Sequence, residues 1–323
     1  MTAFNIGNID PNSINPDSYQ LPKQLATGAA EIDELYYYIY WFSIAFFVVI
    51  VVCMVWFCIA YRRRPGVKAA PAGHNLKLEI AWTVIPLLMT PVLFHLGFKG
   101  YVHSAVAQEG ALEIRVRGQK WVWGFEYPNG MKENGVLRIP VNKPVKMIMS
   151  SEDVIHSFFV PGARVKKDAV PGMYSTLWFT PNTVGDLQVF CAEYCGTSHS
   201  GMLATIKVVP QEEFDRFIKE GPGPESGETP ELWGARLYKQ NACNTCHSTD
   251  GSKMPGPTWK GIIGRDETMA DGSHVTIEEN YVKESILKPQ AKIVNGYQNV
   301  VMPQFALSDK QIDALIAYMK TLK

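Results

Sequence analysis

The chain has few cysteines and no net charge. These two features argue against a protein stabilised by disulfides and against one that binds nucleic acid. Six cysteines occur among 323 residues, and four of them fall in two short motifs. The others, Cys53 and Cys58, lie inside an apolar run, so no pair remains for a structural disulfide. The formal net charge is zero, which gives no basic field for nucleic acid. The length suits two or three domains.

Charged residues are absent from residues 35–61, which are mostly apolar and aromatic. A bilayer core needs about 20 apolar residues of helix, and this run exceeds that length. A second uncharged run, residues 80–98, contains Pro86 and Pro91. Such prolines are better tolerated in membrane helices than inside soluble ones. We therefore expect a transmembrane hairpin over residues 31–104, with spans at about 35–61 and 80–101.

The basic residues near the two runs predict the orientation of the hairpin. Between the runs lie Arg62, Arg63, Arg64, Lys68 and Lys77, whereas the preceding tail has only Lys23. Because basic loops stay in the cytoplasm, both termini are expected on the extracytoplasmic side, with residues 1–30 as an N-terminal tail. This tail has no basic start followed by an apolar core, so no cleavable signal is visible. We expect a bacterial cytoplasmic membrane protein.

Residues 105–212 show the alternation of β-strands. Apolar Leu112, Ile114 and Val116 interleave with charged residues, and similar short segments follow at residues 137–139, 145–149, 187–190 and 203–209. Short strands separated by turns predict an all-β sandwich or barrel. Residues 213–230, rich in proline and glycine from Gly221 onward, are expected to be a linker.

Residues 231–323 are expected to form an all-α domain. Near its end, Ser308 and Gln311 have the spacing of a capping box. An apolar stripe follows at Ile312, Leu315, Ile316 and Met319. The chain is therefore predicted to be a multidomain membrane protein.

The first cysteine motif places two thiolates, an imidazole and a thioether in one short segment: Cys191, Cys195, His199 and Met202. This soft ligand set suits copper. His156, at the end of an upstream strand-like stretch, is a further candidate, and two cysteines allow two bridging thiolates and a two-copper centre. The alternatives are a Cys191–Cys195 disulfide, which leaves the other three residues without a role, and zinc, which rarely takes a thioether.

The second motif is Cys243-Asn244-Thr245-Cys246-His247, the pattern for covalent attachment of haem c. Cys243 and Cys246 would form the thioethers, and His247 would bind the iron. A zinc or thioredoxin interpretation lacks a second cysteine pair and a βαβ context. The sixth iron ligand should be methionine or histidine. Met302 is favoured over Met254, because Met254 follows His247 too closely to reach the other side of a porphyrin.

Residues 30–210, with these copper motifs, resemble subunit II of the haem–copper cytochrome c oxidases. The resemblance implies a cupredoxin-like domain with a dinuclear copper centre, CuA. Its ligands would be His156, Cys191, Cys195, His199, Met202 and the backbone carbonyl of Glu193. The Glu193 carboxylate would help to hold a magnesium ion at the interface with subunit I. Residues 231–323 resemble class I cytochromes c, in which the loop at residues 255–261 supports the proximal histidine through a carbonyl.

Two further residues are given roles by the resemblance. Trp121, in the aromatic segment 118–127, matches the tryptophan that passes electrons into the copper, although a core aromatic would also fit the sequence. Glu79, in segment 75–86, matches a glutamate at the entrance of a proton channel into subunit I. A carboxylate at the cytoplasmic start of a span can also be merely interfacial.

The domain order resembles subunit II of a caa-type oxidase fused to a cytochrome c. The implied function is electron input: from an external donor, such as a cytochrome c or another small redox protein, through haem c and CuA to haem a in subunit I. There oxygen would be reduced to water with proton translocation. Alternatives are a CuA subunit of a nitric oxide reductase, disfavoured by the Glu79 segment, and a free-standing membrane-anchored carrier, in which Glu79 and Glu193 would have no task.

Overall fold

The chain divides into two compact units in a computed structural model that describes residues 20–68, 73–225, 227–305 and 307–323. One unit is residues 27–106, and the other combines the chain up to Ala26 with residues 107–323. The N-terminal tail predicted at residues 1–30 therefore lies largely outside the described residues.

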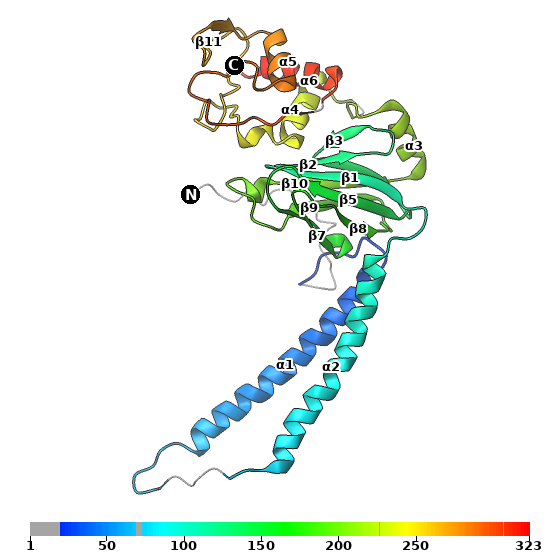
Figure 1. Cartoon of the computed structure of the whole chain (residues 1–323), viewed down its shortest axis with the longest axis vertical. Coiled ribbons are helices and arrows are strands. Elements are labelled where there is room, and N and C mark those ends of the chain that lie inside the picture. Colours follow the sequence, from blue (N-terminus) through cyan, green and yellow to red (C-terminus); the bar gives the residue numbers. More distant parts are fainter. Residues whose placement is uncertain (1–19, 69–72, 226, 306) are drawn as a thin grey trace. The chain divides into compact units, whose positions relative to one another are not determined.

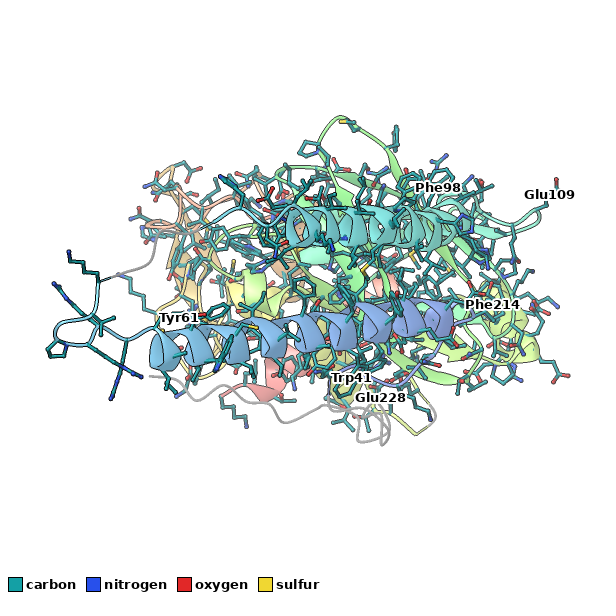
Figure 2. The ribbon with its side chains drawn as sticks, turned by 90° about the horizontal axis from the view of Figure 1, so that it is seen from below. Trp41, Tyr61, Phe98, Glu109, Phe214 and Glu228 are labelled. Atoms are coloured by element: carbon teal, nitrogen blue, oxygen red, sulfur yellow. The ribbon has the colours of Figure 1, made fainter. Side chains whose placement is uncertain are left out.

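The first unit is a helical hairpin of α1 (Ala29–Ala60) and α2 (Leu76–Ala105) (Figure 1). Both helices are long and apolar enough to cross a membrane. Each begins before the predicted span, and α2 starts where the Asn75 side chain accepts a hydrogen bond from Leu78 N at 3.2 Å. Pro86 and Pro91 lie inside α2, as expected. Large apolar side chains such as Trp41 and Phe98 are exposed along both helices (Figure 2), as lipid contact requires.

Residues 112–209 form the predicted β-sandwich, built from two five-stranded sheets. The first sheet has the order β3 (Lys132–Asn134), β2 (Val122–Glu126), β1 (Leu112–Gln119), β5 (Val145–Ser151), β8 (Ser175–Phe179). The second has the order β4 (Val136–Pro140), β10 (Leu203–Val209), β9 (Gly185–Cys191), β6 (His156–Val160), β7 (Val165–Ala169). Ile114 and Val116 are fully buried between the sheets, so the alternation of apolar and charged residues correctly predicts the inward face of β1.

The connection after the sandwich is shorter than predicted. Of the expected linker at residues 213–230, the first part belongs to α3 (Gln211–Glu220). Phe214 and Phe217 on this helix are buried against the ring of Tyr127, with centroids 6.4 and 5.5 Å away. This burial stabilises a helix where composition alone indicated irregular structure. The helix ends before Gly221.

The C-terminal domain is framed by α4 (Pro230–Gln240), α5 (Glu279–Leu287) and α6 (Asp309–Thr321). Helices α4 and α6 cross so closely that a Cβ at Gly234 would lie 2.0 Å from Ala314 O. The capping box is confirmed: Ser308 N donates to Gln311 Oε1 at 2.9 Å at the start of α6. The helical framework carries one addition, a two-stranded hairpin of β11 (Asp266–Thr268) and β12 (His274–Thr276).

Candidate functional site

Strand pairing brings the distant copper candidates together. Strand β6 begins at His156, strand β9 ends at Cys191, and the two strands pair antiparallel with Phe158 opposite Cys191. His156 therefore lies beside the loop that leaves β9. That loop contains the short helix η3 (His199–Gly201), which turns the chain back before β10.

All six predicted copper donors lie close together: five come from this loop and its ends, and His156 comes from the start of β6. Sγ of Cys191 lies 3.9 Å from His156 Nδ1, 3.8 Å from Cys195 Sγ and 3.3 Å from Glu193 O. Sγ of Cys195 lies 3.5 Å from His199 Nδ1 and 3.8 Å from Met202 Sδ. A disulfide needs sulfurs about 2.05 Å apart, so both cysteines are free to act as ligands. Two thiolates, two imidazoles and a thioether fit copper better than zinc.

The two thiols differ in acidity. Burial raises the pKa of Cys191, but hydrogen bonds with His156 and with the Ser157 backbone outweigh it and lower this pKa to about 6. Burial and the negative charge of Cys191 raise the pKa of Cys195 to about 12. Near neutral pH the site therefore has one thiolate ready, and binding of a cation would release the proton of the other thiol.

Asp153 is a functional residue that the sequence analysis missed. Its Oδ1 lies 2.8 Å from His156 Nε2, the ring nitrogen that faces away from the sulfurs. Its Oδ2 accepts a hydrogen bond from Lys120 N at 2.8 Å. Hydrogen bonds with Cys191 and Asp153 raise the pKa of His156 although burial lowers it. A carboxylate that orients a metal-binding histidine is a recurrent arrangement, and an acid three residues before His156 was the available signal.

Trp121 connects the copper loop to a second site. Its indole Nε1 donates a hydrogen bond to Cys195 O at 3.2 Å. Its neighbour Trp123 is fully buried and packs edge-on against Phe158 with ring centroids 5.0 Å apart. Trp123 is therefore a core aromatic, whereas Trp121 is partly buried at the edge of the same core.

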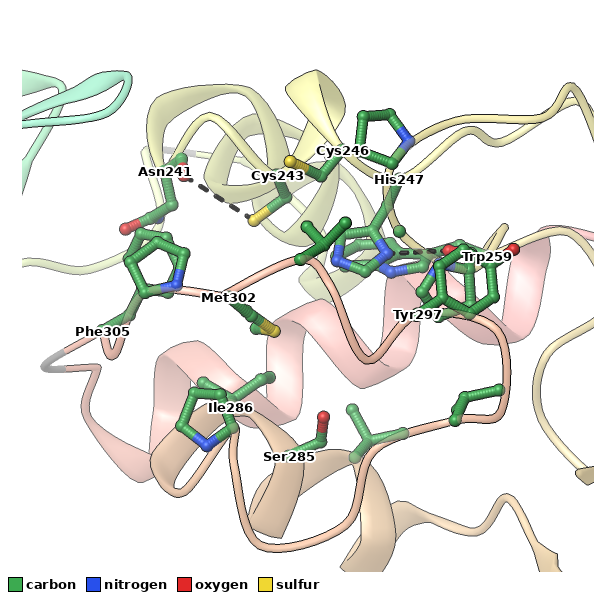
Figure 3. Close-up of a pocket in the computed structure, with 18 of the residues that line it drawn as sticks. Asn241, Cys243, Cys246, His247, Trp259, Ser285, Ile286, Tyr297, Met302 and Phe305 are labelled. Atoms are coloured by element: carbon green, nitrogen blue, oxygen red, sulfur yellow. Dashed lines mark hydrogen bonds between the residues drawn. The ribbon is translucent and has the colours of Figure 1, made fainter. Parts of the chain in front are cut away.

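The second site is an apolar cleft around the Cys-x-x-Cys-His motif, at the short helix η4 (Cys243–Thr245). Cys243, Cys246, His247 and Met302 all line it, and Trp121 lies on its wall. Figure 3 shows the side chains of His247 and Met302 in the same cleft. Met302 lines the cleft, whereas Met254 is not among the lining residues.

His247, the candidate iron ligand, is fixed in orientation by one hydrogen bond. His247 Nδ1 donates to Pro257 O at 2.7 Å, which leaves Nε2 free for a metal. Burial lowers the pKa of His247, so the imidazole stays neutral. A Cβ at Gly256 would lie 2.8 Å from the ring, so glycine is required for the loop to approach. The cleft, the two thiols and the neutral imidazole fit a covalently attached haem.

The carboxylates of Glu79 and Glu193 take no part in these contacts. Glu79 is in the first turn of α2, where its Oε1 lies 3.3 Å from His74 Nδ1. The side chain of Glu193 is exposed, and only its carbonyl oxygen approaches Cys191. This carboxylate is therefore accessible to a ligand from outside the chain.

Comparisons with known proteins identify the family of the chain. Three family profiles match successive parts of the chain: cytochrome c oxidase subunit II, transmembrane domain, at residues 16–99; its periplasmic domain at residues 131–209; and cytochrome c at residues 233–323. Cytochrome c oxidase subunit 2 of Alkalihalophilus pseudofirmus is 31% identical over 290 residues, which cover 85% of this chain and 82% of that protein.

Two further proteins are similar to parts of this chain. A probable cytochrome c oxidase subunit 2 of Rickettsia bellii is 30% identical and covers 58% of this chain and 78% of its own length. The solved periplasmic domain of subunit II of cytochrome oxidase from Bradyrhizobium japonicum is 28% identical over 35% of this chain and 95% of its own, with a TM-score of 0.35. The chain belongs to the cytochrome c oxidase subunit II family, in a form fused to a cytochrome c domain.

Proposed function

We propose that this chain is the electron-input subunit of a respiratory cytochrome c oxidase. It takes electrons from an external donor and passes them toward haem a of subunit I, where oxygen is reduced to water and protons are translocated. The observation that carries the proposal is the position of Trp121. One side chain lines the haem cleft and also donates a hydrogen bond to the backbone of a copper ligand, Cys195.

The protein residues supply a rigid frame for this transfer. Haem c and dinuclear copper, when bound, each accept and release one electron. The pairing of strands β6 and β9 and the hydrogen bonds of Asp153 position the copper donors. A ligand set that is preorganised in this way changes little on oxidation or reduction, which favours fast transfer at small driving force. Methionine and histidine as iron ligands raise the potential of a haem, which suits a late position in a respiratory chain.

The same proposal gives roles to both glutamates and an orientation to the hairpin. The exposed Glu193 carboxylate would bind magnesium at the boundary with subunit I, and Glu79 would stand at the entrance of a proton channel on the cytoplasmic side. Both redox domains would then be extracytoplasmic, which agrees with the basic residues Arg62, Arg63 and Arg64 between the two helices.

A reduced-minus-oxidised optical spectrum tests the proposal, taken on the complex purified through a tag on this chain. We expect haem c bands together with haem a bands. Haem c with only b-type haem would instead favour a nitric oxide reductase. Haem c alone would indicate a free-standing carrier and overturn the assignment to an oxidase.

A further inference from the structure

The turn between β3 and β4 makes an unusually close backbone contact with the end of helix α4. Gly135 has φ of +68°, and a Cβ there would lie 2.2 Å from Gln240 O. Real Cβ atoms do not approach other atoms so closely, so only glycine allows this contact. Gly135 also belongs to the sandwich, since its N–H donates to Trp123 O at 2.8 Å and its carbonyl accepts from Thr205 N at 2.9 Å.

A pair of amide side chains, one of them buried, lies beside this contact. Asn134 Nδ2 donates to Asn241 Oδ1 at 2.9 Å, although the two residues are far apart in the chain. Asn241 is only 2% exposed, and its own Nδ2 donates to Leu237 O at 2.9 Å. Its side chain is therefore fixed from both sides. An amide hydrogen bonded on both sides defines one geometry, whereas an apolar contact would allow sliding.

Ionic contacts act on the chain that leads to α4. Lys207 of β10 forms an ion pair with Glu225 at 2.7 Å, and Arg236 of α4 binds Glu228 through two nitrogens. Glu133 forms an ion pair with Arg138, and the positive charge of Arg236 also acts on it. Positively and negatively charged groups thus alternate from the sandwich through the connection to the helix.

The contact lies directly before the haem attachment sequence. Asn241 is followed after one residue by Cys243, and Asn241, Cys243 and Trp121 all line the haem cleft. We propose that Asn134 and Gly135 form a docking site for the end of α4, and that this site holds the haem attachment loop against Trp121. The inference rests on the proposed function, because its consequence is the rate of electron transfer from haem c to CuA.

Gly135→Ala tests the docking site in the intact complex. Its matched control is Gly130→Ala, in the preceding hairpin turn: Gly130 has φ of +82°, but a Cβ there meets nothing within 4 Å. Both substitutions carry the same backbone strain, and only Gly135→Ala adds the clash with α4. Asn134→Ala is the second variant, which removes the amide contact without backbone strain.

The measurement is the oxidation of haem c after its rapid photoreduction by an external ruthenium dye, with copper absorption followed in parallel. Since small displacements at a transfer site have large effects on rate, Gly135→Ala should slow transfer on the order of tenfold or more. Asn134→Ala should slow it several-fold, and Gly130→Ala should leave it unchanged. The absorption spectra of haem c and copper should be the same in all variants.

The outcomes separate this inference from the proposed function. Unchanged rates in both Gly135→Ala and Asn134→Ala, with normal transfer in the unaltered complex, would overturn the docking site alone. Equal slowing in Gly130→Ala and Gly135→Ala would also overturn it, because backbone strain would then be the cause. Absence of transfer from haem c to copper in the unaltered complex would overturn the proposed function itself.

Discussion

Met202 is the copper-site residue whose side chain can be exchanged with least disturbance to the fold. It is fully buried, with its sulfur 3.8 Å from Cys195 Sγ. Because Leu and Met have similar volumes, Met202→Leu should cost less than about 1.5 kcal/mol of stability. The loss of the thioether should change the copper absorption and EPR spectra and slow oxygen consumption, with the haem c spectrum as internal control. An unaltered copper spectrum would show that Met202 is not a ligand.

At the residue scale, the sequence predicts the candidate copper-binding residues better than the residues that orient them. Cys191, Cys195, His199 and Met202 are close in the chain, so their convergence follows from spacing alone. The hydrogen bonds of Asp153 to Lys120 N and His156 depend on how β1 and β6 lie across the sandwich. The spacing of Asp153 and His156 gives a local signal for their contact, but the hydrogen bond from Lys120 N joins residues 33 positions apart and becomes evident only in the folded chain.

At the scale of elements, helix α3 shows where composition misleads. Its sequence is mostly charged, yet Phe214, Phe217 and Ile218 have the i, i+3, i+4 spacing of one helical face. Glu212 and Glu213 in the first turn and Lys219 in the last also match the helix dipole. These signals were present, but the glycines and prolines beyond Gly221 dominated the prediction. Five of the ten sandwich strands, β1, β4, β5, β9 and β10, were predicted from the sequence, whereas β2, β3, β6, β7 and β8 were not. His156 begins β6, although it was expected at the end of a strand-like stretch.

Phe217→Ala tests whether α3 stabilises the copper domain. The ring is buried, packs against Tyr127 and lies 4.7 Å below the Arg138 guanidinium. Its removal should lower the free energy of unfolding by about 3 kcal/mol, through lost burial and a residual cavity. Thermal loss of the copper absorption band should therefore occur at lower temperature. Glu213→Ala, at an exposed position of the same helix, is the control; an equal effect of both changes would contradict a packing role.

At the scale of the whole molecule, contacts between domains are the least predictable part. Asn134 and Asn241 belong to no motif, and their pairing depends on two domains folding first. The same holds for Trp121, whose place on the wall of the haem cleft joins residues more than a hundred positions apart. The sequence therefore predicts each redox site by itself. The contacts that join the two sites become visible only in the structure.

The connection between the domains should respond to acid. Hydrogen bonding to Lys207 lowers the pKa of Glu225, and hydrogen bonding to Arg236 lowers that of Glu228, both from 4.5. A carboxyl whose pKa is lower in the folded state stabilises the fold at pH values above its pKa in the unfolded state. This stabilisation is lost as the pH falls through its pKa in the folded state. Hydrogen exchange at residues 221–225, corrected for intrinsic rates, should therefore accelerate below pH 4.5. In Glu228→Gln, part of the protection against hydrogen exchange should already be missing at pH 7. If protection is unchanged both at low pH and in this variant, these ion pairs do not stabilise the connection.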